Sequence, residues 1–315
     1  MKLPPFSLHR PGSVAAASRL LADLGDDAAA YCGGTELLLA MKLGLASYEH
    51  LVDLKRVDGL RGITTGRDGT LRIGAAATHH QIETSAAVRA CYPELSAMLS
   101  RVANLRVRSV GTLGGNLCFA DPHSDPAPFL IAAGATMTCQ RGQVTRRIPA
   151  DRWLAGPYQT VLDPGELLTS VELPPRPPGA GLAHLRMKLT ERPVVSVTAL
   201  VTRSGAEVRS ARLVIGSVGG VPFTAATNSL IGAGPQDFAA RTEACARQAA
   251  AECAPQPDGE ASPDYLRQLV FVQARQALSQ AFAAAARELT EAPACQVANR
   301  AASPFSAVPA DQPAD

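Results

Sequence analysis

Two glycine-rich stretches, CGGTE at residues 32–36 and GTLGGN at residues 111–116, decide the fold of this chain. Each follows or precedes an apolar segment of the kind that forms strands and helices. Paired glycines let a backbone approach a ligand closely and adopt dihedral angles that other residues avoid. Successive backbone N–H groups in such a turn form an anion-binding nest. Two nests predict a pyrophosphate-containing cofactor that is gripped from two sides.

The two stretches differ in how specific they are. The first can equally well end a strand, because it lacks the G-x-G-x-x-G spacing of the dinucleotide fingerprint. The second is more specific, because Thr112 and Asn116 flank its glycines with hydrogen-bonding side chains. A polar run follows at 121–125, and its Asp125 is expected to contact a ribityl, ribose or ring group. In the same run, Asp121 is interpreted as a capping residue and His123 as a solvent-facing loop histidine.

Composition excludes several classes of function. The 315 residues are 46% hydrophobic and 18% charged with a net charge of +2, which indicates neither nucleic acid nor a membrane surface as partner. Aromatic residues make up only 4%, which disfavours base-stacking surfaces. The seven cysteines are scattered without a C-x-x-C pair, so we expect no metal site in this chain and a cytoplasmic location. No apolar stretch has the length of a membrane span.

The pattern around the first stretch predicts a small βαβ unit. Ser13 can cap a helix that ends at Gly25, and a strand at 28–32 leads into the glycines. Further elements are expected as a helix at 37–45, strands at 50–55 and 70–75, helices at 81–88, 94–102 and 127–133, a hairpin from 135–139 to 144–148, and a strand at 166–173.

A proline-rich segment at 174–179 is the clearest domain boundary, because its prolines favour a stiff extended linker. Beyond it we expect strands at 182–189, 194–202 and 211–217 and helices at 238–252 and 265–289. The predicted domains are a first cofactor-binding subdomain at 1–58, a second at 59–176, a sheet-plus-helices domain at 177–290 and a disordered tail at 291–315.

The motifs resemble those of the FAD-binding medium subunit of the molybdenum hydroxylase family, of the carbon monoxide dehydrogenase and xanthine dehydrogenase type. The similarity covers about residues 1–290, in family order. It implies an α+β fold, in which a two-subdomain FAD-binding unit of the vanillyl-alcohol oxidase type precedes a C-terminal domain of a three-stranded antiparallel sheet and helices. The matching stretches are 32–38 with Met41-Lys42, 73–78, 111–116, 165–168 and 187–189.

The resemblance also implies a set of residues that contact FAD. The backbone at 32–37 and at 112–116 would bind the diphosphate, Asp125 and Leu168 would contact the cofactor, and Lys188 would lie near the isoalloxazine. By itself, an isolated strand lysine such as Lys188 is usually part of a solvated face. We expect no catalytic residue and no metal ligand in this chain. The implied cofactor-binding residues are Cys32, Gly33, Gly34, Thr35, Glu36, Leu37, Thr112, Gly114, Gly115, Asn116, Asp125, Leu168 and Lys188.

Two departures from the family pattern affect the expected site. Cys32 replaces the usual small apolar residue, and a thiol is little larger, so binding should survive. The segment 190–193 lacks an aromatic residue that some relatives place beside the flavin, which leaves the electron acceptor open. No four-cysteine insertion is present, so we expect no additional iron–sulfur cluster.

The function implied by the resemblance is electron transfer through FAD. The molybdenum cofactor would lie on a large molybdopterin-binding subunit and two [2Fe–2S] clusters on a small subunit, in a dimer of heterotrimers. Electrons would pass through FAD in this chain to an external acceptor. Two alternatives stay open: a self-contained FAD-dependent oxidase or dehydrogenase, and a flavin-free scaffold subunit, against which the intact glycines argue. The substrate would bind on another chain, so this sequence does not identify it.

Overall fold

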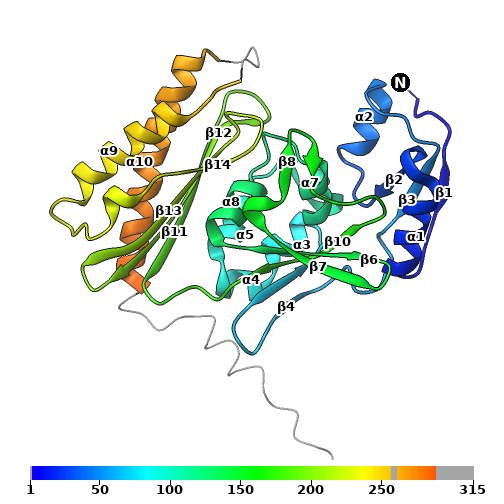
Figure 1. Cartoon of the computed structure of the whole chain (residues 1–315), viewed down its shortest axis with the longest axis horizontal. Helices are drawn as coiled ribbons and strands as arrows, with labels where there is room; N and C mark the ends of the chain where they lie inside the picture. Colours follow the sequence, from blue (N-terminus) through cyan, green and yellow to red (C-terminus); the bar gives the residue numbers. More distant parts are fainter. Residues whose placement is uncertain (1, 257–260, 289–315) are drawn as a thin grey trace, which may run out of the picture.

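The computed structural model describes residues 2–256 and 261–288 of the chain. Figure 1 shows three units in a row: a small N-terminal sheet with two helices, a central sheet with short helices, and a C-terminal sheet covered by two long helices. The segment predicted to be a disordered tail, 291–315, lies outside the described residues.

The N-terminal unit is the predicted βαβ arrangement with one additional strand. Strand β3 lies in the middle and pairs in parallel with both β1 and β2. The hydroxyl of Ser13 accepts a hydrogen bond from the amide of Ala16 at 3.2 Å, so the predicted cap is confirmed. β1 was not predicted, because three residues carry no alternation. The elements are β1 (Ser7–His9), α1 (Val14–Leu24), a 3-10 turn (Gly25–Asp27), β2 (Ala28–Tyr31), α2 (Leu37–Leu43) and β3 (His50–Asp53).

The central sheet is antiparallel throughout, in the order β4-β5-β10-β6-β7. Its strands are β4 (Ile63–Thr65), β5 (Leu71–Gly74), β6 (Thr136–Arg141), β7 (Val144–Pro149) and β10 (Leu167–Leu173), and a separate pair is formed by β8 (Leu154–Gly156) and β9 (Gln159–Thr160) after a 3-10 turn (Ala150–Arg152). The predicted hairpin is confirmed as β6 and β7, and the strands predicted at 70–75 and 166–173 are confirmed as β5 and β10.

Short helices pack around this sheet. The single helix predicted at 81–88 is wrong, because Ser85 ends one helix and its hydroxyl caps the next by accepting from the amide of Val88. Two helices, α6 and α7, were not predicted. Every residue of α8 is buried, so it forms part of the central core. The helices are α3 (His79–Thr84), α4 (Ala86–Cys91), α5 (Pro93–Leu99), α6 (Leu105–Val110), α7 (Leu113–Phe119) and α8 (Pro126–Ala133).

The C-terminal sheet has four strands, so the expected count of three is wrong by one short edge strand. The additional strand, β14, has only three residues and pairs with β13. The sheet is antiparallel in the order β11-β12-β13-β14, and helices α9 and α10 cover one face (Figure 1). The elements are β11 (Ala180–Lys188), β12 (Pro193–Ser204), β13 (Glu207–Gly216), β14 (Phe223–Ala225), a 3-10 turn (Asn228–Leu230), α9 (Phe238–Glu252) and α10 (Pro263–Glu288).

The proline-rich connection between the central and C-terminal sheets is pinned rather than free. The Tyr92 hydroxyl donates to the carbonyl of Pro174 at 2.5 Å. The Arg176 guanidinium donates to the Glu94 carboxylate at 3.0 Å and to the carbonyl of Ala180 at 2.7 Å. The linker therefore fixes the C-terminal sheet against α5.

The contact between β11 and α10 should be very sensitive to added volume. A Cβ atom on Gly181 would lie 2.0 Å from the carbonyl oxygen of Ala281 and 2.3 Å from the amide nitrogen of Ala285, and neither backbone atom can move away alone. We expect Gly181→Ala to lower the free energy of unfolding by about 2 kcal/mol or more. Urea unfolding measures this, with Gly12→Ala as control because nothing lies within 4 Å of that added atom. Equal stabilities of the two variants would contradict the packing described.

Candidate cofactor site between the two glycine motifs

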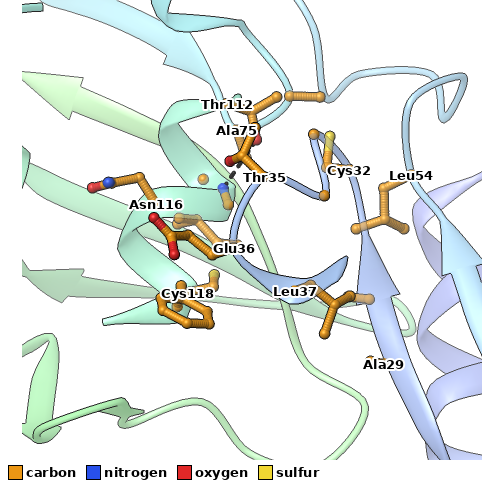
Figure 2. A pocket seen from close by; sticks show the side chains of 18 of the residues that line it. Ala29, Cys32, Thr35, Glu36, Leu37, Leu54, Ala75, Thr112, Asn116 and Cys118 are labelled. Atoms are coloured by element: carbon orange, nitrogen blue, oxygen red, sulfur yellow. Dashed lines mark hydrogen bonds between the residues drawn. The ribbon is translucent and has the colours of Figure 1, made fainter. Parts of the chain in front are cut away.

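The two glycine motifs meet at a cavity of about 490 Å³ between the N-terminal unit and the central sheet. Figure 2 shows the first motif on one side of it, with Thr112, Asn116 and Cys118 across from it. Of the predicted residues, those that line the cavity are Cys32, Gly33, Gly34, Thr35, Glu36, Leu37, Thr112, Gly114, Gly115, Asn116 and Leu168. The sequence stretches that are eighty residues apart are thus brought together as expected.

The first motif presents a run of unengaged backbone donors. Gly34 has a φ of +70°, a left-handed conformation that favours glycine. Within residues 2–256 and 261–288, no acceptor is found for the backbone N–H groups of residues 33–36. Successive donors without an acceptor are what an anion-binding nest requires, and the binding of an anion here stays a prediction.

The second motif is not a nest, and that expectation is wrong. Residues 113–119 form helix α7, and the hydroxyl of Thr112 caps it by accepting from the amide of Gly115 at 3.0 Å. The amide of Leu113 donates to the carbonyl of Ala77 at 3.0 Å. The amides of Gly114 and Asn116 donate to backbone carbonyls at 2.8 and 3.0 Å. These N–H groups are already satisfied, so α7 forms a wall of the cavity.

The glycines of both motifs are required for close backbone packing. A Cβ atom on Gly33 would lie 2.3 Å from the carbonyl oxygen of Val110, at the end of α6. One on Gly114 would lie 2.7 Å from the Cβ and carbonyl oxygen of Ala75. The buried Trp153 indole donates to the carbonyl of Leu117 at 2.9 Å and holds α7 in place. The cavity walls are therefore set by backbone contacts.

Polar side chains in the walls are mostly neutral. The Asn116 carbonyl oxygen accepts from the hydroxyl of Ser124 at 2.6 Å, which ties α7 to the polar run that follows it. Burial raises the pKa of the Cys32 thiol, although its hydrogen bond with Thr112 opposes this. Cys32 is therefore a neutral thiol at pH 7, compatible with an anion close by.

Sequence reasoning missed two features of the lining. His79 lines the cavity, and its Nδ1 is buried without a hydrogen-bond partner in the described part of the chain. Its only sequence signal is its place directly after Thr78, which opens the capping box of α3. Phe119 and Tyr158 form an edge-on aromatic pair with ring centroids 5.5 Å apart, and both line the cavity.

Asp125 and Lys188 are predicted site residues that do not line this cavity. Asp125 is buried, with its carboxylate 2.5 Å from the Arg186 guanidinium and 3.4 Å from Nε2 of His184. Burial alone would raise the pKa of Asp125, but His184 and Arg186 outweigh it and the pKa is lowered. Partial burial and Arg186 lower the pKa of Lys188 at the end of β11. Contact of either residue with a cofactor stays a prediction.

The described ranges give no sign of two other kinds of site. Among residues 2–256 and 261–288, no group of three His, Cys, Asp or Glu side chains is arranged to hold a metal ion. In the same part of the chain, no helix combines the length and apolarity of a membrane span.

A comparison with protein families decides the identity of this architecture. Residues 4–176, more than half of the chain, match the family described as the FAD binding domain in molybdopterin dehydrogenase. The chain belongs to this family. The resemblance inferred from the glycine motifs is thereby confirmed, and with it the class of oxidoreductase subunits.

Two relatives in this family are similar to this chain over nearly their whole length. The carbon monoxide dehydrogenase medium chain of Afipia carboxidovorans is 32% identical over 283 residues, which are 89% of this chain and 98% of that protein. A putative xanthine dehydrogenase FAD-binding subunit of Escherichia coli K12 is 27% identical over 287 residues, 90% and 98% of the two chains.

Solved structures agree with this. Carbon monoxide dehydrogenase from Hydrogenophaga pseudoflava matches with a TM-score of 0.86 and 31% identity, over 90% of this chain and 99% of that chain. Quinoline 2-oxidoreductase from Pseudomonas putida 86 matches with a TM-score of 0.83 and 29% identity, over 92% and 100%.

The buried imidazole of His79 should make the free energy of unfolding depend on pH. Burial, and secondarily the nearby Arg108, lowers the pKa of His79 from 6.5 to about 4. Between these values the unfolded chain binds a proton that the native chain does not, so stability falls as the pH decreases from above 6.5 towards 4. A shift of this size corresponds to about 3 kcal/mol.

We expect His79→Gln to lose this component, so that its unfolding free energy falls less than that of the wild type between pH 7 and pH 4.5. Urea unfolding at each pH measures the difference, and His80→Gln is the control because His80 lies beside it and has a partly exposed side chain. Parallel pH profiles for wild type and His79→Gln would show that His79 titrates normally.

Proposed function

We propose that this chain is an FAD-binding electron-transfer subunit of a molybdenum hydroxylase, which receives electrons from partner [2Fe–2S] clusters and passes them to an external acceptor. The observation that supports this most directly is the run of unengaged N–H groups at 33–36, which faces the wall formed by α7. Successive neutral donors in this number suit the negatively charged oxygens of a diphosphate.

The residues present fit FAD in a definite division of roles. Backbone amides at 33–36 would hold the diphosphate, with the Thr35 hydroxyl beside them. Thr112, Gly114, Gly115 and Asn116 would form the opposite wall, and Leu168 would supply an apolar surface. FAD, when bound, supplies the electron-carrying chemistry, while the protein binds and orients it.

Two of the predicted cofactor-binding residues, Asp125 and Lys188, lie outside this cavity. Asp125 and Lys188 sit where the polar run after α7 meets β11, and we propose that this region lies at the isoalloxazine end. His184 and Arg186 together lower the pKa of Asp125, so that its carboxylate is ionised there and can act as a hydrogen-bond acceptor. The proposed role of the described residues is therefore to bind and orient the cofactor. This role requires no pair of residues that transfer a proton.

The proposed partners follow from relatives that the chain covers almost completely. It aligns with 98% of the carbon monoxide dehydrogenase medium chain and with 98% of the xanthine dehydrogenase FAD-binding subunit. We propose a large molybdopterin-binding subunit that holds the molybdenum cofactor and a small subunit that holds two [2Fe–2S] clusters, in a dimer of heterotrimers. The substrate pocket would lie on the large subunit.

The proposal requires one non-covalently bound FAD per chain. Acid denaturation followed by filtration should release a flavin that chromatography identifies as FAD, in a one-to-one ratio with protein. Flavin retained by the precipitated protein, or FMN in the filtrate, would contradict the assignment. Reconstitution with added FAD guards against loss of cofactor during purification.

Gly33→Ala should strongly reduce FAD affinity, because the added carbon would meet backbone atoms of Val110 and Gly111 at 2.3 and 2.7 Å and force the two motifs apart. We expect the dissociation constant to rise by about a hundredfold, the equivalent of roughly 2.7 kcal/mol. Fluorescence titration of the apoprotein measures it.

The matched control is Gly219→Ala, whose added atom approaches nothing nearer than 3.4 Å and which lies outside the cavity. It should bind FAD like the wild type. If Gly33→Ala folds and binds FAD equally well, the first motif is not where the diphosphate lies.

A further inference from the structure

One arginine of the C-terminal domain reaches across to the cofactor cavity. Arg192 lies in the loop between β11 and β12, and its Nη2 is 3.0 Å from Oε2 of Glu36. The same guanidinium also pairs with the carboxylate of Asp121. A single side chain thus joins three segments that lie far apart in the sequence.

Both carboxylates belong to segments that carry the cofactor motifs. Glu36 precedes α2, lines the cavity and ends the run of unengaged N–H groups. Asp121 lies just beyond the end of α7 and is almost fully buried, whereas Arg192 is about half exposed. Arg192 therefore closes a bridge between the two sides of the cavity from outside it.

A second contact fixes this bridge independently of the ion pairs. The backbone amide of His123 donates to Oδ1 of Asp121 at 2.9 Å, and Nδ1 of His123 lies 2.8 Å from the carbonyl oxygen of Pro193. The loop after α7 and the loop that carries Arg192 are thus held together at two adjacent points. Because these contacts hold the loop that carries Arg192, they also keep its guanidinium close to Glu36 and Asp121.

The electrostatic consequence concerns the anion that the cavity would bind. A carboxylate beside a diphosphate opposes its binding, and two would oppose it more. The Arg192 guanidinium pairs with both carboxylates, and a positive charge at this place opposes their effect on a nearby anion. A lysine would supply the charge without the fork that contacts two carboxylates at once.

We propose that Arg192 is a positioning residue for FAD: it screens Glu36 and Asp121 from the diphosphate and holds the C-terminal domain over the cavity. The proposal rests on the proposed function, because it concerns the affinity for that cofactor. It adds that the C-terminal domain, and not the two FAD-binding subdomains alone, determines how tightly the cofactor is held.

The test is a fluorescence titration of the apoprotein with FAD at two salt concentrations. Arg192→Met should raise the dissociation constant by about tenfold at low salt and by less at high salt, since screening weakens the exposed carboxylate field. Arg192→Lys should lose less, because it keeps the charge. Arg247→Met, an exposed arginine paired with Glu243 on α9, is the control and should bind like the wild type.

The decisive variant is the double substitution Glu36→Gln with Arg192→Met. If Arg192 acts by neutralising Glu36, the arginine substitution should matter much less in the Glu36→Gln background, and Asp121→Asn should relieve the remainder. Thermal unfolding of the apoproteins, with unchanged midpoints, excludes a general loss of folding.

The possible failures are distinguishable. A wild type that binds no FAD would overturn the proposed function and this inference with it. A wild type that binds FAD and an Arg192→Met variant that binds equally well would overturn only the role of Arg192. A tenfold loss that neither carboxylate substitution relieves, or that salt does not change, would also overturn it, because the arginine would then act by packing.

Discussion

The backbone contact between Gly33 and Val110 is the constraint on which the cofactor site depends. At Gly33 no side chain separates the first motif from the end of α6, so main-chain atoms set the distance between the two walls at this point. Because α7 is itself held by its cap at Thr112 and by the Trp153 indole, its position leaves the first motif little freedom. Residues 33–36, whose N–H groups have no acceptor in the described part of the chain, are therefore held in place at the cavity.

The two glycine motifs look alike in sequence but differ in whether their backbone amides are hydrogen-bonded. The glycines at 33–34 allow both a left-handed turn and close packing, and they leave their amides unengaged. The glycines at 114–115 sit in a capped helix whose amides are satisfied by the protein. The first motif is suited to hold an anion, and the second shapes the wall opposite it.

Two arginines of the C-terminal domain pair with carboxylates of the N-terminal and central units. Arg186 on β11 pairs with Asp125, and Arg192 in the following loop pairs with Glu36 and Asp121. Each arginine reaches a carboxylate on a segment of the FAD-binding region. The C-terminal domain therefore supplies positive charge to carboxylates of the FAD-binding region, and its sheet packs against the central core.

The sequence predicted the parts of this site that depend on local pattern. The βαβ unit, the cap at Ser13 and the convergence of the motifs follow from turns and apolar spacing. The helical state of the second motif did not, because its amides find the carbonyls of Ala75 and Ala77 only in the folded chain. His79 and Arg192 were missed for the same reason: their places depend on contacts with residues tens of positions away or more.

The most direct test of the account is amide hydrogen exchange of the apoprotein with and without FAD, followed by mass spectrometry at the resolution of short peptides. Unengaged amides exchange quickly, and a bound diphosphate should protect them. The account predicts strong new protection at 33–36 and little change at 113–116, whose amides are already hydrogen-bonded without a ligand. Protection confined to 113–116, or none at 33–36 at saturating FAD, would contradict it.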